Sequence, residues 1–424
     1  MILLILFLLL LILGMPLAFS LLLTGFAYFI SADQLPLLVG VQRIVAASQS
    51  FPLLAVPFFI LAGHIMNKSS ITQRLIEFSN LLVAWITGGL AHVSIVLSAL
   101  MGGVSGSAIA DAAMQSRILG KPMIDAGFSR GFSGGIIAVS ALITATIPPS
   151  IGLILYGFVG NVSIGKLFIA GIVPGILMTL LLMLTTYIVA KKRGYKPHTK
   201  QKPSFKQIIH AMRDSKWALL FPIILIVTIR MGIFTPSEAG AFAVVYATVV
   251  GMFAYKSLGF ADIKVALHES ISDIGMIMLI ILFSGMIGYM FAYEQLPVEL
   301  ATTISQITTN PRLVLFLCLA LLLTVGMLME GTVTVLLLTP ILVPMIQMVG
   351  IDPVHFGILM LIMVSFGGTT PPVGIAMYTV CGILKCPTHE YVKETLPFFI
   401  AVLVLVAILA FFPSIVLFLP NLLF

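Results

Sequence analysis

The chain consists of long apolar stretches separated by short polar segments. An α-helix needs about 20 mostly apolar residues to cross the hydrocarbon of a bilayer, and many of these stretches approach that length. Membrane-spanning β-strands would instead appear as shorter segments of alternating apolar and polar residues. We therefore predict transmembrane helices within residues 2–30, 51–66, 81–100, 136–158, 167–190, 217–231, 241–255, 274–293, 313–329, 333–349, 356–379 and 398–419.

A second pattern is internal similarity. The segment 134–152 resembles the segment 357–374, with a Pro-Pro pair falling on a Pro-Pro pair at an offset of 223 residues. The same offset places Gly103 on Gly326. In many secondary transporters two such halves are inverted repeats, and the substrate and ion sites lie near mid-membrane, where helices break in matching positions.

We therefore predict an all-α polytopic membrane protein built from two inverted structural repeats. Each repeat is expected to contain a re-entrant helical hairpin and a broken transmembrane helix. The halves are 1–190 and 217–424, joined by the linker 191–216, with hairpins near 90–120 and 313–349 and broken helices near 136–158 and 356–380.

The Pro-Pro pairs indicate ion sites. Proline has no N–H for the helical hydrogen bond, so two in succession free backbone carbonyl groups. In a membrane such groups must be buried in protein or line a wet cavity. Carbonyl and threonine oxygens are ligands that suit a desolvated sodium ion. A simple proline kink is the alternative, and the matched pair in the two halves favours the ion site.

Two acidic residues lie in apolar surroundings near the predicted hairpin tips, Asp111 and Glu330. Intramembrane carboxylates are costly and usually functional, so Asp111 is a candidate ion-linked or proton-linked group. The alternative is a carboxylate that reaches water or pairs with Arg117 or Arg130. His64 and His92 are interpreted as structural residues or as residues near an interface, because nothing near them resembles a metal-binding set.

Composition and charge limit the function classes. Hydrophobic residues make up 60% of the chain and charged residues 9%, against roughly a quarter in soluble domains, so lipid is the expected surroundings. The linker 191–216 holds nine Lys and Arg residues against Asp214 alone. The positive-inside rule makes it cytoplasmic, which explains the charge better than nucleic-acid binding. No phosphate-binding loop for ATP is present.

The motifs together resemble the large permease subunit of tripartite ATP-independent periplasmic (TRAP) transporters, the DctM-like family. They occur in order along almost the whole chain, and only together are they specific. The matching stretches are 54–63 (LAVPFFILAG), 105–111 (SGSAIAD), 147–150 (IPPS), 170–175 (AGIVPG), 234–241 (FTPSEAGA), 338–340 (LTP) and 370–374 (TPPVG).

This resemblance implies an elevator-type importer, not an enzyme, with a scaffold and a moving transport domain in the bacterial inner membrane. It implies import of small organic anions, such as sialic acid, C4-dicarboxylates, and sugar or keto acids. A sodium gradient would drive the import, with Na+ as the coupling ion and no other cofactor. It also implies a periplasmic solute-binding protein and a small four-helix membrane subunit as partners.

The resemblance also implies positions for two sodium sites. One departure from the family pattern is Val333, where members often carry proline three positions after the acidic residue of the second hairpin. The sodium-binding residues implied are Ser105, Ser107, Thr144, Ile147 and Pro149 for one site and Gly326, Met329, Thr369 and Thr370 for the other; the substrate contacts expected are Gly106, Glu330, Gly331 and Arg130.

Two other functions are compatible with parts of the sequence. A stand-alone ion-coupled carboxylate carrier of a related inverted-repeat fold would show the same physical pattern. An intramembrane serine protease is suggested by the segment 103–106 (GVSG), but it would need a base near Ser105 and leaves the internal similarity unexplained.

Overall fold

The computed structural model describes residues 2–32, 35–199, 201–308 and 310–424, and within these ranges every regular element is a helix. This confirms the all-α prediction. Seven of the described helices are long and apolar enough to cross a membrane, or eight if one bent pair is counted as a span. Lys200 of the basic linker lies outside the described residues.

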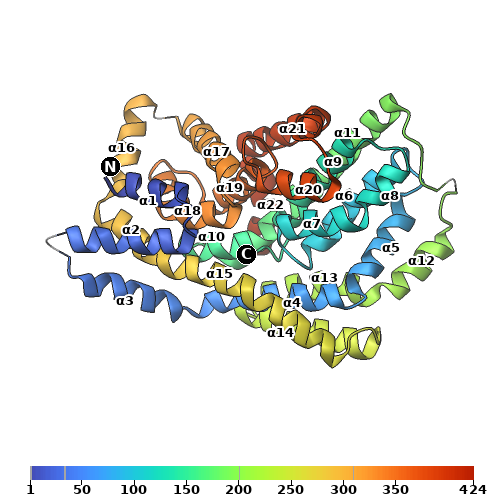
Figure 1. Ribbon diagram of the computed structural model, residues 1–424, viewed down its shortest axis with the longest axis horizontal. Helices are drawn as coiled ribbons and strands as arrows, with labels where there is room; N and C mark the ends of the chain where they lie inside the picture. The colour runs from blue at the N-terminus through green and yellow to red at the C-terminus, as the bar shows by residue number, and fades with distance from the viewer. Residues whose placement is uncertain (1, 33–34, 200, 309) are drawn as a thin grey trace.

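The helices are numbered as in Figure 1. They are α1 (Ile2–Ile12), α2 (Leu17–Ser31), α3 (Leu37–Ser48), η1 (Phe51–Leu54), α4 (Ala55–Lys68), α5 (Ile71–Val83), α6 (Gly89–Gly102), α7 (Ala108–Ile118), α8 (Gly120–Asp125), α9 (Arg130–Thr146), α10 (Ile151–Val159), α11 (Ile164–Arg193), α12 (Phe205–Asp214), α13 (Lys216–Arg230), α14 (Pro236–Val249), η2 (Val250–Ala254), α15 (Phe260–Tyr293), α16 (Leu296–Ile307), α17 (Pro311–Leu328), α18 (Gly331–Met348), α19 (Pro353–Gly367), α20 (Ile375–Leu384), α21 (Thr388–Phe411) and α22 (Pro413–Leu423).

Several predicted spans differ from the observed helices. The stretch 2–30 is divided into α1 and α2, because Gly14 adopts a left-handed φ of +80° and Pro16 precedes the second helix. The stretch 398–419 is divided at Pro413, the first residue of α22. Conversely, α15 begins well before residue 274, since its first half is polar yet remains helical.

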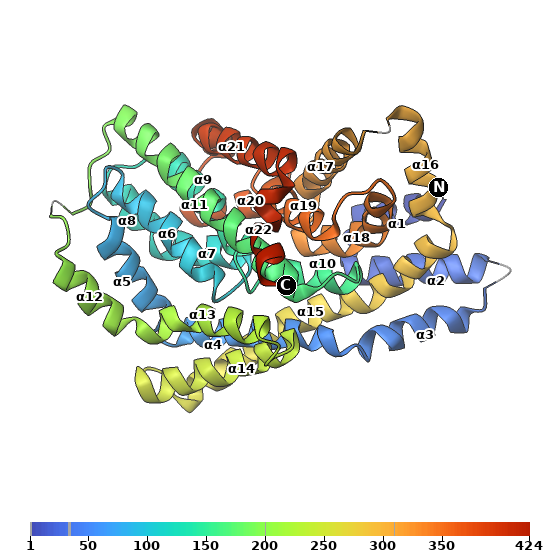
Figure 2. The same ribbon diagram turned by 180° about the vertical axis from the view of Figure 1, so that it is seen from behind.

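The helices form two groups that pack against each other (Figures 1 and 2). Helices α3, α4, α14 and α15 run along one side, where α4 packs on both α14 and α15. The other group surrounds α9 and α19, and every residue of α9 from Gly131 to Thr146 is buried. A helix buried on all sides suits the uniformly apolar or small residues found there.

Helix positions recur at the offset seen in the sequence. The helices α7 and α18 begin 223 residues apart, at Ala108 and Gly331, and so do α9 and α19, at Arg130 and Pro353. Ser107 caps α7 and Glu330 caps α18, again 223 residues apart. This regularity supports the interpretation of two repeats.

The two central helices also begin at opposite ends of α21. The N–H of Gly131, at the start of α9, donates to Glu390 in the first turn of α21, over 3.0 Å. His355, at the start of α19, lies 2.9 Å from the carbonyl oxygen of Leu409 near the other end. Those two points on α21 are about 28 Å apart at 1.5 Å per residue. An inverted repeat requires this antiparallel placement, and the inversion itself stays a prediction.

Candidate functional site

The tip of the first hairpin, between α6 and α7, packs directly on the break between α9 and α10. Gly106 has φ +60°, and a Cβ there would lie 2.2 Å from the carbonyl oxygen of Pro149. A Cβ on Gly102 would lie 2.7 Å from Cβ of Ile147. The two predicted elements of the first ion site are therefore in backbone contact, and only glycine allows the approach.

The first break leaves backbone oxygens without helical partners. The α-helical pattern would pair the carbonyl groups of Thr144 and Ala145 with residues 148 and 149, but both are prolines without an N–H. The chain also turns here, because α9 and α10 form a pair bent by 48°. Among the described residues, the buried hydroxyl of Ser105 has no hydrogen-bond partner. The site therefore offers several oxygens at a buried position.

The second hairpin tip packs on the second break in the same way. A Cβ on Gly367 would lie 2.5 Å from the carbonyl carbon of Gly326. The N–H of Gly374 donates to the carbonyl of Met327 over 3.1 Å. Residues 326–327 at the tip of the second hairpin thus contact the segment 367–374, as the sequence pattern predicted.

Backbone carbonyl oxygens at the second break accept hydrogen bonds from neighbouring residues. The N–H of Ala376 donates to the carbonyl of Gly368, and the Tyr391 hydroxyl donates to the carbonyl of Thr369, both over 2.9 Å. The expectation that Pro-Pro pairs leave carbonyl groups unpaired is therefore only partly correct here. Accessibility differs as well, since Pro371 and Pro372 are exposed whereas the prolines of the first break are buried.

Asp111 lies at the centre of a buried hydrogen-bond network. It is 1% exposed, and its Oδ2 accepts hydrogen bonds from Ser98 (2.8 Å), Gln115 (2.9 Å) and Thr144 (2.7 Å). These partners come from α6, α7 and α9. Asp111 thus neither reaches water nor pairs with arginine, which corrects the alternative considered above, and its Oδ1 is buried without a partner.

This network belongs to the first half of the chain. The Ser94 hydroxyl extends it by donating to Gln115 over 2.6 Å. At the offset of 223 residues, the counterparts of Ser98, Asp111 and Gln115 are leucine, threonine and leucine. The two halves therefore share helix positions but differ in the chemistry behind their hairpin tips.

The remaining predicted residues occupy different places. Glu330 caps α18, accepting from the Val333 N–H over 3.1 Å and from the Thr332 hydroxyl over 3.0 Å. Proline at position 333 could not supply that N–H, so the departure from the family pattern fits this cap. Gly331 begins α18 beside it. Arg130 is exposed at the start of α9, about 24 Å along the helix from the break, and is not brought to either hairpin tip.

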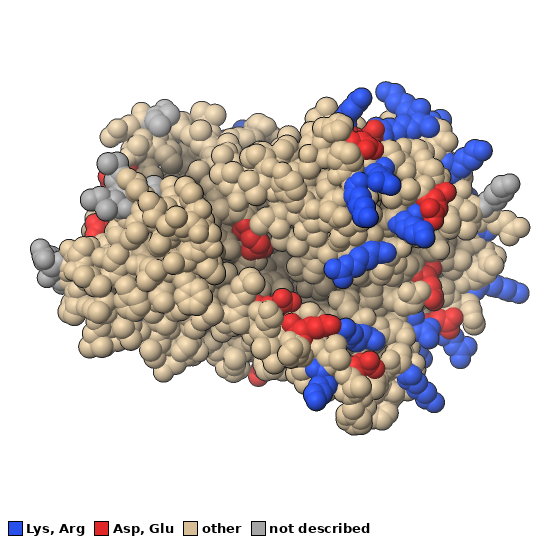
Figure 3. All heavy atoms as spheres, in the orientation of Figure 1, with Lys and Arg blue, Asp and Glu red and all other residues tan. Residues whose placement is uncertain are grey.

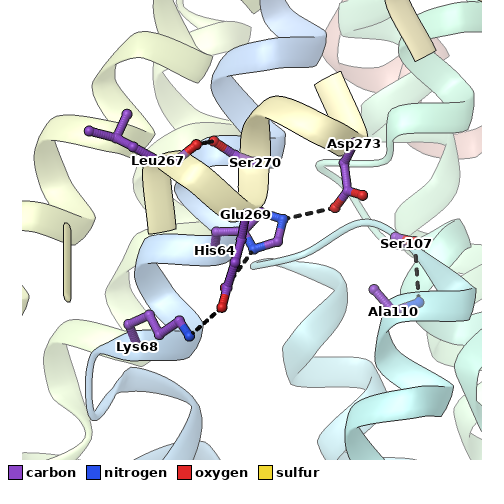
Figure 4. A network of polar contacts seen from close by, with 8 residues as sticks. All are labelled: His64, Lys68, Ser107, Ala110, Leu267, Glu269, Ser270 and Asp273. Atoms are coloured by element: carbon purple, nitrogen blue, oxygen red, sulfur yellow. Dashed lines mark hydrogen bonds and ion pairs between the residues drawn. The ribbon is translucent and has the colours of Figure 1, made fainter. Parts of the chain in front are cut away.

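A charged cluster that the sequence pattern did not single out lies between α4 and α15 (Figure 4). His64 Nε2 is 2.9 Å from Asp273 Oδ2, and His64 Nδ1 is 3.5 Å from Glu269 Oε2. Lys68 Nζ donates to Glu269 Oε1 over 2.7 Å. His64, interpreted from the sequence as structural or near an interface, is the central member of this cluster. The sequence feature that could have revealed the cluster is the spacing of four residues within each of the pairs 64/68 and 269/273.

This cluster lies beside the first hairpin tip. A Cβ on Gly63, next to His64, would lie 3.8 Å from Cα of Ser105. Figure 4 shows Asp273 on the side of the cluster that faces the loop of Ser107. In Figure 3, acidic side chains gather over α15 at the edge of a hollow, whereas lysine and arginine gather at one end of the molecule.

The protease interpretation finds no support in this geometry. Ser105 has no hydrogen-bonded base among the described residues, and the nearest helix places His64 between two carboxylates instead. A serine nucleophile needs an adjacent general base.

Comparisons with known proteins agree with the fold and the motifs. Residues 4–415 match the family described as the tripartite ATP-independent periplasmic transporter, DctM component. The chain is 39% identical over 409 residues to the sialic acid TRAP transporter large permease protein SiaM of Vibrio cholerae, covering 96% of this chain and 95% of that protein. It is 34% identical over 403 residues to the 2,3-diketo-L-gulonate TRAP transporter large permease protein YiaN of Escherichia coli, covering 95% and 94%.

A solved structure shows the same fold at low sequence identity. The YdaH transporter of Alcanivorax borkumensis aligns with a TM-score of 0.61 and 17% identity, over 88% of this chain and 87% of that one. The relatives named above are transporter permease subunits and not enzymes.

Proposed function

Because the chain belongs to the DctM family, the large permease components of bacterial TRAP transporters, we propose that it is the subunit that carries a small organic anion across the inner membrane in symport with sodium. The single observation that carries the sodium coupling is the contact of each hairpin tip with a Pro-Pro break. In the first of these contacts, Gly106 lies against the carbonyl of Pro149.

The substrate class follows from the relatives. SiaM is named for sialic acid and YiaN for 2,3-diketo-L-gulonate, and both are carboxylates. We propose a carboxylate of this size for this chain. The helices α7 and α18 begin at the hairpin tips and suit an anion, since the positive end of each helix dipole points toward that region.

Each proposed sodium site uses oxygens from one hairpin tip and from the break that it contacts. The first takes oxygens of Ser105, Ser107, Thr144, Ile147 and Pro149. The second takes oxygens of Gly326, Met329, Thr369 and Thr370. Carbonyl groups that prolines leave unpaired are already desolvated, so binding a cation costs them little water. Packing of both tips on both breaks would let sodium and substrate fix one rigid transport unit.

The family implies two partners, a small membrane subunit and a periplasmic binding protein. We propose that the binding protein delivers the substrate and that the hairpins and broken helices move as an elevator against α4 and α15. The basic linker 191–216 would lie in the cytoplasm, as the positive-inside rule predicts.

Reconstitution tests the proposal. The permease and its small subunit are placed in proteoliposomes, and uptake of radiolabelled sialic acid, 2,3-diketo-L-gulonate and succinate is measured. The expected result is uptake of at least one anion that requires both an inward sodium gradient and the binding protein. Uptake that is indifferent to sodium would contradict the coupling, and uptake without the binding protein would favour a stand-alone carrier.

A further inference from the structure

The cluster between α4 and α15 has a regular order of charges. Along the two antiparallel helices, Asp273 faces His64 at one level and Glu269 faces Lys68 at the next, and His64 also approaches Glu269. Each level is four residues, or about 6 Å, from the other. These four side chains are called the charge ladder below.

The charge ladder extends from the first hairpin tip toward the basic end of the molecule. Its Asp273 end lies beside the loop of Ser107 (Figure 4). Beyond Lys68, the Arg74 guanidinium donates to the carbonyl of Asp214 in the basic segment over 3.3 Å. The ladder thus begins beside the proposed substrate site and ends at Lys68, six residues before Arg74, which contacts the basic linker.

The ladder is balanced in charge. Each ring nitrogen of His64 faces a carboxylate oxygen, which suits the protonated imidazole, the one form with an N–H on both nitrogens. In that form, two positive and two negative charges alternate. All four side chains remain partly exposed, with exposed fractions from 24% for His64 to 56% for Asp273. Enclosed ion pairs would exclude an entering ion, whereas these side chains are partly accessible in the isolated chain.

We propose that the charge ladder is an exchange path for the anionic substrate on the scaffold face. A substrate carboxylate leaving the hairpin tip would take the place of Asp273 on His64, then that of Glu269 on Lys68. Each step replaces one carboxylate by another on the same cation, so His64 and Lys68 each keep a partner while the displaced, partly exposed carboxylate is released. This inference rests on the proposed function and adds the residues that guide the anion.

Balance between the two signs is what makes such a path work. Two bare cations would hold the anion and slow its release, whereas two bare carboxylates would repel it. A purely structural role predicts that any neutralisation weakens the protein in the same direction. An exchange path predicts opposite effects for acidic and basic neutralisations.

The test compares KM and maximal rate of sialic acid uptake in proteoliposomes that contain the permease, its small subunit and the binding protein. Asp273→Asn frees a cation and is expected to lower both KM and the maximal rate, by roughly three- to fivefold for partly exposed pairs. His64→Gln is expected to raise KM by a similar factor. The double variant His64→Gln/Asp273→Asn removes one level entirely and is expected to restore KM to within about twofold.

Controls separate this inference from folding and from the proposed function. His268→Gln and Lys264→Gln change exposed groups on the same helix α15 and are expected to leave KM unchanged. If the unaltered complex shows sodium-dependent uptake while both single variants shift KM in one direction, or neither shifts it, the exchange path is overturned and the proposed function stands. A double variant worse than either single variant would likewise show a structural role. Absence of sodium-dependent uptake by the unaltered complex for all three test anions would instead overturn the proposed function, and this inference with it.

Discussion

The substitution Gly106→Ala tests whether the first hairpin tip and the first break form one ion site. The added Cβ would lie 2.2 Å from the carbonyl oxygen of Pro149, whereas real Cβ contacts essentially never fall below 3.0 Å, so the two segments must separate by about 0.8 Å. The obstacle is backbone rather than a flexible side chain, and it cannot rotate away. Gly106 also has φ +60°, which costs an alanine roughly 1–2 kcal/mol.

The displacement exceeds what an ion site tolerates. Binding groups must be held within about 0.5 Å of their productive positions. We therefore expect the sodium concentration for half-maximal uptake to rise by about tenfold or more, equivalent to at least about 1.4 kcal/mol. The maximal rate at saturating sodium should fall less, because excess sodium can draw the segments back together.

The control is Gly194→Ala. Gly194 has a similar φ of +69°, but nothing lies within 4 Å of its added Cβ. It therefore carries the backbone strain without the collision. Sodium titrations of uptake and thermal unfolding of both variants are compared in the reconstituted complex. If Gly106→Ala has the same sodium dependence as Gly194→Ala, the packing of the hairpin on the break does not build the site, and the reasoning is refuted.

Substitutions at three further residues address other contacts. Asp111→Asn replaces a carboxylate, one oxygen of which accepts three hydrogen bonds, by an amide. This change should lower the unfolding free energy by about 1–3 kcal/mol, and an unchanged melting temperature would contradict this. Tyr391→Phe removes the hydrogen bond to the Thr369 carbonyl, which should cost about 1 kcal/mol in thermal unfolding and change the sodium concentration for half-maximal uptake. Glu330→Ala removes the side chain that caps the Val333 N–H and should lower the free energy of unfolding by about 0.5–2 kcal/mol. Glu330→Asp retains a capping carboxylate and should lower it less.

The breaks and hairpins could be predicted because their causes are local. Proline removes an N–H wherever it stands, and a Gly-Ser cluster weakens a helix regardless of its surroundings. The offset of 223 residues, read from a few motifs, agrees with the starts of α7 and α18. The division of the first apolar stretch was not predicted, because hydropathy alone does not register the turn at Gly14 and Pro16.

The charge ladder and the Asp111 network could not be predicted in the same way. His64 and Asp273 are 209 residues apart, and only the packing of α4 on α15 brings them together. The polar first half of α15 fell outside the predicted span 274–293 because its charged residues lower the local hydropathy. Their cost in a membrane helix is offset by partners on α4 that a single sequence does not reveal.

The unequal chemistry of the two halves bears on how coupling would work. Matching helix positions bring both hairpin tips against a break, yet among the described residues only the first tip is backed by a buried carboxylate. The first break is enclosed, whereas the second exposes Pro371 and Pro372, with Val373 42% exposed. An ion could therefore exchange with the surroundings at the second site while the first stays closed. In the proposed mechanism, similar hairpin contacts with unequal access would let the sodium ions bind in order, and an ordered sequence would prevent the transport unit from moving when only partly loaded.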